Sequence, residues 1–172
     1  MNKLLGKHIF RFFLFVSIQV LILNNIFFWG YINPYAYIIF ILLLPISIQK
    51  NQLLLLSFFL GLTIDMFQNS MGTHAFACVL IAYLRINILQ FLIPQIKNKH
   101  QGLTEISFKE FGIQTSLIYC SILTIVHHLV LFSIEIFRFD ILHILSRSIA
   151  SSFFTVLIIM FFQFVFINSN KK

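Results

Sequence analysis

Charged residues are scarce in this sequence. Asp, Glu, Lys and Arg make up 10% of the chain and only five residues are acidic, whereas about 25% of a typical soluble domain is charged. Hydrophobic residues account for 59% of the 172 residues. A soluble domain of this length could not remove so much apolar surface from water. The composition therefore excludes a soluble enzyme, a soluble binding module, a coiled coil and a disordered tail.

Cysteine, proline and glycine are also few, with two, three and six residues respectively. Cys78 and Cys120 both fall within apolar segments, where cysteine is a small packing residue, so no disulfide framework is indicated. The apolar runs are continuous rather than alternating, which argues against a transmembrane β-barrel. We expect an all-α membrane protein whose residues 1–172 form a single integral membrane domain without an extramembrane domain.

The apolar runs are long enough for a six-transmembrane-helix bundle, because one span needs about 20 residues. The expected spans lie at about 9–29, 31–48, 53–67, 72–93, 111–137 and 141–167. The first run resembles a signal peptide but is too long and lacks a small-residue cleavage site, so we expect a retained helix. A basic loop at 95–110 ends in Ser107-Phe-Lys-Glu110, a capping-box pattern that predicts a helix start near Phe108.

The distribution of Lys and Arg predicts the orientation of the chain. One side of the expected bundle carries Lys3, Lys7, Arg11, Lys50, Lys97, Lys99, Lys109, Lys171 and Lys172. The other side carries Arg138. The positive-inside rule then places both termini and loop 95–110 in the cytoplasm. The expected outer end of the first hairpin holds an aromatic belt of Trp29, Tyr31, Tyr35 and Tyr37.

These cations lie at span ends and form no patch, so we expect no nucleic-acid partner. The lysines of loop 95–110 would instead contact anionic membrane lipids, each contributing about 1 kcal/mol near the surface.

Polar groups are costly inside a bilayer, which singles out Asp65 in the third span. Gly61 precedes it by four residues and so lies on the same helix face. A glycine there would let a neighbouring helix approach closely, and Asp65 would cap or pair across that contact. We expect a buried structural role for Asp65. The alternative is an interfacial carboxylate that reaches water.

The residues that follow, Gln68-Asn-Ser-Met-Gly-Thr-His74, interrupt the hydrophobic run and predict a tight outer hairpin containing Gly72. Thr73 is the expected N-cap of the fourth span. His74 falls in the first turn of that helix, where we expect a hydrogen-bonding role. A ligand-binding or proton-relay role is the alternative.

Two arginines fall within spans. Arg85 lies about 13 Å from the expected cytoplasmic end of the fourth span, so it must either snorkel or find a backbone carbonyl or partner protein. Arg147, in the sixth span, has three candidate partners on the expected outer side: Asp140, Glu135 and Asp65.

His127 and His128 lie in the fifth span. Adjacent helical residues point about 100° apart, so both cannot easily bind one metal and at least one should face a neighbouring helix. The H-E-x-x-H, G-x-S-x-G and P-loop patterns are absent. We expect no catalytic residue, no metal and no cofactor. An intramembrane hydrolase that uses one of these histidines is the weakest alternative.

The segment from Gly61 to Arg85 resembles the rod shape-determining MreD family. Members of that family look like G-L-x-x-D, a short turn, a Gly, and an apolar helix that ends in a Tyr-Leu-type pair. The residues that match this pattern here are Gly61, Leu62, Asp65, Gly72, Tyr83 and Leu84. The match covers about 25 residues.

The resemblance implies a fold similar to the six-helix substrate-binding component of energy-coupling-factor transporters. It also implies a non-catalytic scaffold of the cell-elongation machinery in a bacterial inner membrane, acting with the bitopic protein MreC, the MreB filament, and RodA with its transpeptidase. The alternative is a small-molecule-binding subunit of a transporter. The candidate structural or partner-binding residues are Gly61, Asp65, Gly72, His74, Arg85 and Arg147.

Overall fold

The apolar runs form helices in the computed structural model, which describes residues 2–26, 32–94, 96, 108–135 and 140–169. Among these residues, five helices are long and apolar enough to cross a membrane. They are α1 (Asn2–Leu21), α3 (Lys50–Gln68), α4 (Thr73–Leu92), α5 (Phe108–Glu135) and α6 (Ile141–Ser169). The shorter elements are the 3-10 helices η1 (Leu23–Asn25) and η2 (Ala36–Ile38), and helix α2 (Ile39–Leu42).

The exterior of the protein is far more apolar than that of a soluble protein, and several polar side chains lie in its interior. Large apolar side chains point outward, for example Phe91 at 83% exposure and Leu142 at 81%, while His74 and Ser151 are fully buried. Polar groups that face the interior of a bundle with an apolar exterior are typical of membrane proteins. The exposure pattern and the five long apolar helices indicate a multi-pass membrane protein.

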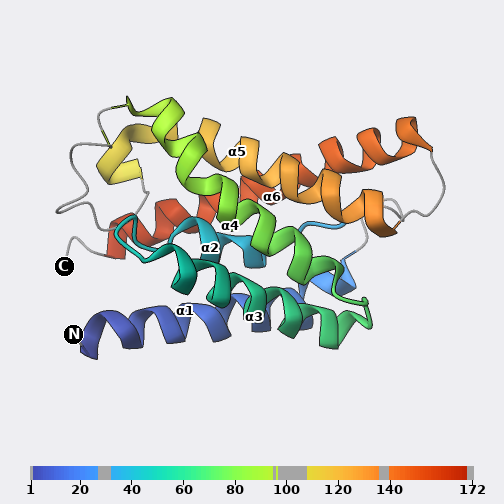
Figure 1. The fold of residues 1–172 in the computed structure, drawn as a ribbon, viewed down its shortest axis with the longest axis horizontal. Coiled ribbons are helices and arrows are strands. Elements are labelled where there is room, and N and C mark those ends of the chain that lie inside the picture. Colours follow the sequence, from blue (N-terminus) through green and yellow to red (C-terminus); the bar gives the residue numbers. More distant parts are fainter. Residues whose placement is uncertain (1, 27–31, 95, 97–107, 136–139, 170–172) are drawn as a thin grey trace.

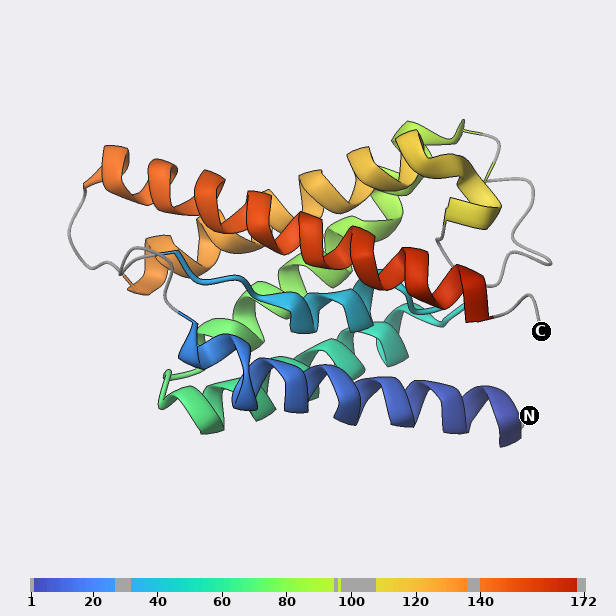
Figure 2. The same ribbon diagram turned by 180° about the vertical axis from the view of Figure 1, so that it is seen from behind.

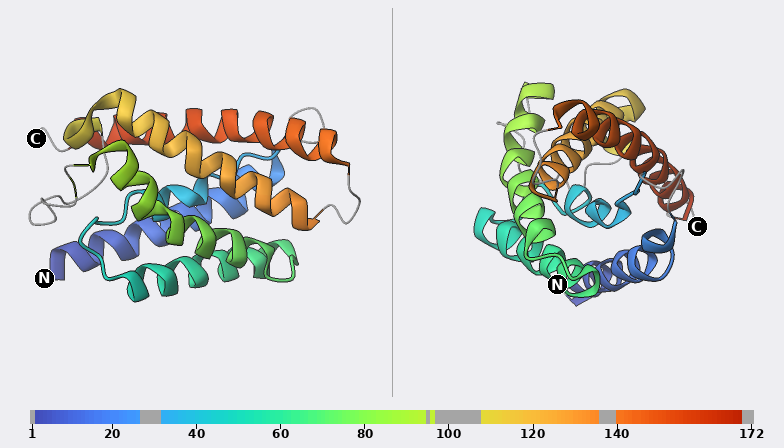
Figure 3. Two further views of the ribbon diagram at one scale, coloured as in Figure 1. Left: turned by 45° about the horizontal axis from the view of Figure 1, so that its top comes forward. Right: turned by 90° about the vertical axis from the view of Figure 1, so that its right-hand side faces the viewer.

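The predicted second span, 31–48, is not a continuous helix. Its described part begins with extended residues and continues through η2 and the four-residue α2. We call residues 32–46 the central segment, because the five long helices surround it (Figure 3, right). Every residue from Tyr35 to Leu44 is at most 3% exposed. Irregular backbone is tolerated at membrane depth only where protein covers it, and here it is covered on all sides.

Burial of this segment also corrects the predicted aromatic belt. Tyr35 and Tyr37 are 3% and 0% exposed and lie in the interior rather than at the membrane surface. Trp29 and Tyr31 lie outside the described residues.

The five long helices and the central segment, taken in chain order, alternate in direction along the long axis of the molecule (Figure 1). The start of α1 and the end of α6 lie together at one end, which we call the terminal end (Figure 2). The α3–α4 turn, the end of α5 and the start of α6 lie at the opposite, distal end. The central segment returns the chain from the distal end to the start of α3, so the termini share one end.

Helix α5 begins at Phe108, as the sequence predicts, although Ser107 lies outside the described residues. The helix is interrupted at Gly112, whose φ of 78° and ψ of 163° are not helical. Most of loop 95–110 lies outside the described residues. Cys78 and Cys120 are both free and fully buried, which confirms their packing role.

Candidate functional site: the polar interior of the distal half

The carboxylate of Asp65 closes the hairpin between α3 and α4. Its Oδ1 accepts the backbone N–H of His74 at 3.0 Å and the hydroxyl of Ser70 at 2.6 Å, and its Oδ2 accepts the N–H of Ala75 at 2.9 Å. These amides belong to the first turn of α4. The backbone N–H groups of a first turn have no hydrogen-bond acceptor within their own helix, and this end of the helix attracts negative charge. Asp65 therefore caps the following helix, and its predicted buried structural role is confirmed by its 4% exposure.

Gly61 permits this arrangement. A Cβ atom at Gly61 would lie 2.4 Å from the Cα of Ala75 and 2.6 Å from the carbonyl oxygen of His74. Backbone atoms cannot move aside as a flexible side chain can, so the two helices could not keep their present separation with any larger residue. The close helix approach predicted at Gly61 is confirmed, and the approaching helix is α4 of the same chain.

The predicted N-cap at Thr73 is wrong by one residue. Gly72 holds the N-cap position with a φ of 86° and makes no side-chain cap. Asn69 ends α3 in the left-handed conformation, with a φ of 53°. The cap that Thr73 was expected to provide comes instead from Asp65, one helix earlier. The tight turn at 68–74 is confirmed.

His74, Tyr37 and His127 form a chain of buried hydrogen bonds. The Tyr37 hydroxyl lies 2.7 Å from Nδ1 of His74 and 2.9 Å from Nε2 of His127. Nε2 of His74 lies 2.8 Å from Oε1 of Gln68. The chain links α3, α4, the central segment and α5, and its two histidines and its tyrosine are fully buried.

The direction of these bonds follows from the amide of Gln68. Its Nε2 donates to Oδ1 of Asn24 at 2.8 Å, so its Oε1 is the atom that faces His74 and can only accept. His74 therefore carries its proton on Nε2 and accepts the Tyr37 hydroxyl proton at Nδ1. Because that proton is used, the tyrosine oxygen accepts from Nε2–H of His127. The bonds then run in one direction, from His127 through the Tyr37 hydroxyl to His74 and on to Gln68.

Side chains also satisfy the irregular backbone of the central segment. Gln19 of α1 donates to the carbonyl oxygen of Pro34 at 3.2 Å and accepts the N–H of Tyr37 at 3.4 Å. On the opposite side, Thr155 of α6 accepts the N–H of Tyr35 at 3.0 Å. These bonds replace those that a transmembrane helix would make within itself.

His128 faces a different neighbour from His127. Its Nδ1 lies 2.9 Å from the carbonyl oxygen of Thr124, one turn earlier, and its Nε2 lies 3.3 Å from the hydroxyl of Thr155 on α6. The two adjacent histidines thus serve separate helix contacts, which confirms the prediction that at least one faces a neighbouring helix. Within the described part of the chain, no group of three His, Cys, Asp or Glu residues could hold a metal ion.

The two arginines lie apart from the Asp65 hairpin. Arg85, 3% exposed, donates from Nη2 to the carbonyl oxygen of Leu44 in the central segment. A backbone carbonyl was one of its expected alternatives. Arg147 forms an ion pair with Glu135 across α5 and α6, with 3.5 Å between Nη1 and Oε2. Glu135 is therefore a partner among the three candidates considered.

The guanidinium of Arg147 also stacks over the Phe132 ring, 4.0 Å from its centroid. The predicted site residues thus fall into separate places. Gly61, Asp65, Gly72 and His74 meet in the α3–α4 hairpin, whereas each arginine has its own surroundings.

Sequence reasoning missed several members of the interior network. Tyr37 gave no signal, because a tyrosine near the end of an apolar run is also typical of an interfacial belt. Gln19 lies in the middle of an apolar span and could have been found by the same cost argument that singled out Arg85. Gln68 and Asn24 were not recognised because they lie beside turns, where amide side chains are common.

A pocket of about 280 Å³ lies at the distal end beside this network. It is lined by Leu23, Asn24, Asn33, Tyr35, Phe67 and Gln68. The Oδ1 atom of Asn33 is buried and makes no hydrogen bond within the described residues. The pocket therefore offers amide groups and aromatic surface together.

Comparison of the chain with protein-family models, with curated proteins and with solved structures gives no match. The resemblance to the MreD family therefore rests on the residues between Gly61 and Arg85.

Proposed function

We propose that this chain is a non-catalytic membrane scaffold subunit of the machinery that elongates rod-shaped bacterial cells. In this proposal it lies in the inner membrane with both termini in the cytoplasm. It holds an MreC-like bitopic protein within a complex that includes an MreB-like filament and a RodA-type glycosyltransferase with its transpeptidase.

The observation that carries the proposal is the joint role of the residues that match the family pattern. Gly61, Asp65 and Gly72 lie within twelve consecutive residues and together build the closely packed and capped α3–α4 hairpin. Such a hairpin is rigid, because close packing and several hydrogen bonds together fix the two helices against each other. A rigid bundle whose polar groups bond to one another suits a part that positions other proteins.

This arrangement changes where a partner would bind. Gly61 and Asp65 are buried inside the chain, so a partner helix must contact the apolar exterior instead. A photo-reactive amino acid placed on the exposed face of each long helix would locate that contact in living cells. Suitable exposed positions are Phe10, Phe59, Phe76, Ile118 and Phe153.

The proposal predicts crosslinks to the MreC-like protein from one helix or two adjacent helices, with the remaining positions as internal controls. The proposal would be contradicted if the photo-reactive variants preserved rod shape but none of them crosslinked to the MreC-like protein.

A second candidate function, a small-molecule-binding subunit of a transporter, is favoured by the distal pocket. Its amide groups, including the Oδ1 of Asn33 that has no partner among the described residues, could recognise a polar ligand. This function predicts that a compound raises the thermal stability of the purified protein and that Asn33→Ala abolishes the effect. A nutrient library that produces no such stabilisation would remove this candidate.

A further inference from the structure

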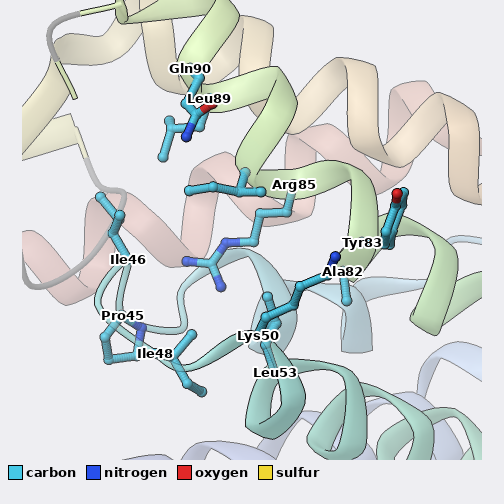
Figure 4. A pocket seen from close by; sticks show the side chains of 11 residues that line it. Pro45, Ile46, Ile48, Lys50, Leu53, Ala82, Tyr83, Arg85, Leu89 and Gln90 are labelled. Carbon is cyan, nitrogen blue, oxygen red and sulfur yellow. The ribbon is translucent and has the colours of Figure 1, made fainter. Parts of the chain in front are cut away.

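A second pocket, of about 240 Å³, lies near the terminal end between the central segment, the start of α3 and the last turns of α4. We call it the Arg85 pocket. Figure 4 shows Arg85 reaching from α4 toward the chain at Pro45 and Lys50. Its walls are largely apolar, formed by Pro45, Ile46, Ile48, Leu53, Ile86 and Leu89.

The guanidinium of Arg85 is incompletely bonded. One terminal nitrogen, Nη2, donates to the carbonyl oxygen of Leu44, whereas Nη1 is buried and has no hydrogen-bond partner within the described part of the chain. Arginine remains charged under these conditions. A buried charged donor without a partner is strongly unfavourable, so this nitrogen indicates that an acceptor belongs in the pocket.

The described side chains of this protein do not supply that acceptor's charge. The carboxylates whose side chains the structure describes are Asp65, Glu135 and Asp140, and each bonds to other groups at the distal end. Tyr119 also interacts with Arg85 through its hydroxyl, but a tyrosine hydroxyl is a polar group rather than a carboxylate and supplies no formal negative charge. Among the side chains that the structure describes, nothing therefore balances the positive charge in the pocket.

Lys50 adds a second cation. Its Nζ atom lies 4.6 Å from the centroid of the Tyr83 ring, and both residues line the pocket. Lys50 is exposed, whereas Arg85 is 3% exposed. One cation is thus buried in the pocket and the other is accessible from outside, a pairing that suits a phosphate group.

We propose that the Arg85 pocket binds the phosphate of an anionic phospholipid. The apolar walls favour a lipid over a free phosphate ion, because a small hydrated anion gains nothing from them while acyl chains do. The pocket also opens near the end of the bundle, the level at which lipid head groups lie. This proposal does not depend on the proposed cell-elongation function.

Native mass spectrometry of the purified protein tests the proposal, with phosphatidylglycerol, phosphatidylcholine and inorganic phosphate as separate probes. We expect retention of one phosphatidylglycerol molecule in preference to phosphatidylcholine. Lys50→Gln should weaken retention about fivefold, the effect of one lysine near an anionic head group. Lys7→Gln is the matched control. It removes an exposed cation from the start of α1, at the same terminal end of the bundle but outside the pocket, and should leave retention unchanged.

Arg85→Gln should weaken retention more strongly, but its burial makes correct folding uncertain. Lys50→Gln and Tyr83→Ala alter exposed residues and test the same pocket without that difficulty. Equal retention by the wild type and by both exposed variants would overturn the proposal. Retention of inorganic phosphate as strong as that of phosphatidylglycerol would assign the pocket to a free anion and overturn the lipid assignment.

Discussion

Asp65 shows how one costly residue can be stabilised inside a membrane protein. Its carboxylate accepts two backbone amides of α4 and one hydroxyl, so the charge is placed where a helix N-terminus is short of acceptors. Gly61 brings α4 close enough for these bonds to form. The two residues act as one unit, and a change at either should affect the stability of the hairpin before it affects any partner.

Replacement of Asp65 by Ala should destabilise the protein by about 2 kcal/mol, because two amides of the first turn of α4 lose their acceptor. Asp65→Asn keeps one acceptor oxygen and should cost less. The buried thiols of Cys78 and Cys120 allow a direct measurement, since a thiol-reactive dye fluoresces as unfolding exposes them. We expect a fall in the unfolding midpoint of about 4–8 °C for the alanine variant.

Met66→Ala is the control. Met66 follows Asp65 in the chain and is 75% exposed, so its replacement should leave the unfolding midpoint unchanged. An equal midpoint for the wild type and Asp65→Ala would show that the cap contributes nothing to stability.

Gly61→Ala should destabilise the protein by about 1–3 kcal/mol, the usual cost of overpacking. The added methyl group would meet the backbone of Ala75, so Ala75→Gly should not restore stability. Gly6→Ala on α1 is the matched control, because a Cβ there meets nothing within 4 Å. Unchanged thermal stability of Gly61→Ala would contradict the close approach of α3 and α4 at this position.

The central segment is the element that gives this molecule its organisation. It crosses the interior as extended chain, η2 and the four-residue α2, and side chains from α1, α4 and α6 bond to its backbone. The hydroxyl of Tyr37 then joins α4 to α5 through His74 and His127. Removal of the segment would therefore leave the surrounding helices with unpaired polar groups.

Tyr37→Phe tests this role with a minimal change in volume. It deprives His74 of a donor and His127 of an acceptor, and buried hydrogen bonds between transmembrane elements contribute about 0.6 to 1.7 kcal/mol each. We expect a lower unfolding midpoint in the thiol assay. Tyr83→Phe, at a ring that is 48% exposed, should behave like the wild type, and an equal effect of both substitutions would argue against the network.

A tryptophan scan of positions 36–44 distinguishes a buried segment from a lipid-facing helix. A transmembrane helix tolerates tryptophan every three or four residues, wherever it faces lipid. The central segment is covered on all sides, so we expect every substitution to reduce the yield of folded protein in size-exclusion chromatography. A periodic pattern of tolerated positions would instead support the helical second span expected from sequence.

At the scale of the whole molecule, the sequence allowed the membrane class, the long helices and the α3–α4 turn to be predicted. Composition and continuous apolar runs determine the first two, and the breaking residues between Gln68 and Thr73 mark the third. Asp65 could be recognised because a charged residue in a membrane span is energetically costly and therefore indicates a structural or functional role.

The central segment could not be predicted in the same way. An apolar run looks alike whether lipid or protein surrounds it, so residues 31–48 resembled a sixth spanning helix. Tyr37 is buried because protein surrounds the central segment, so its burial could not be predicted from the sequence either. Partner choice for Arg85 and Arg147 was also open, because it depends on how helices rotate against one another rather than on spacing along the chain.

The central functional claim is most directly tested by conditional depletion of this protein in the cells that encode it, with cell width and the pattern of new wall insertion scored by microscopy. A scaffold of the elongation machinery predicts that depleted cells widen, become round and lose organised sidewall growth, and that re-expression of the wild-type chain restores rod shape. Unchanged cell width, together with growth that comes to depend on a supplied nutrient, would contradict the scaffold function and favour the transporter subunit.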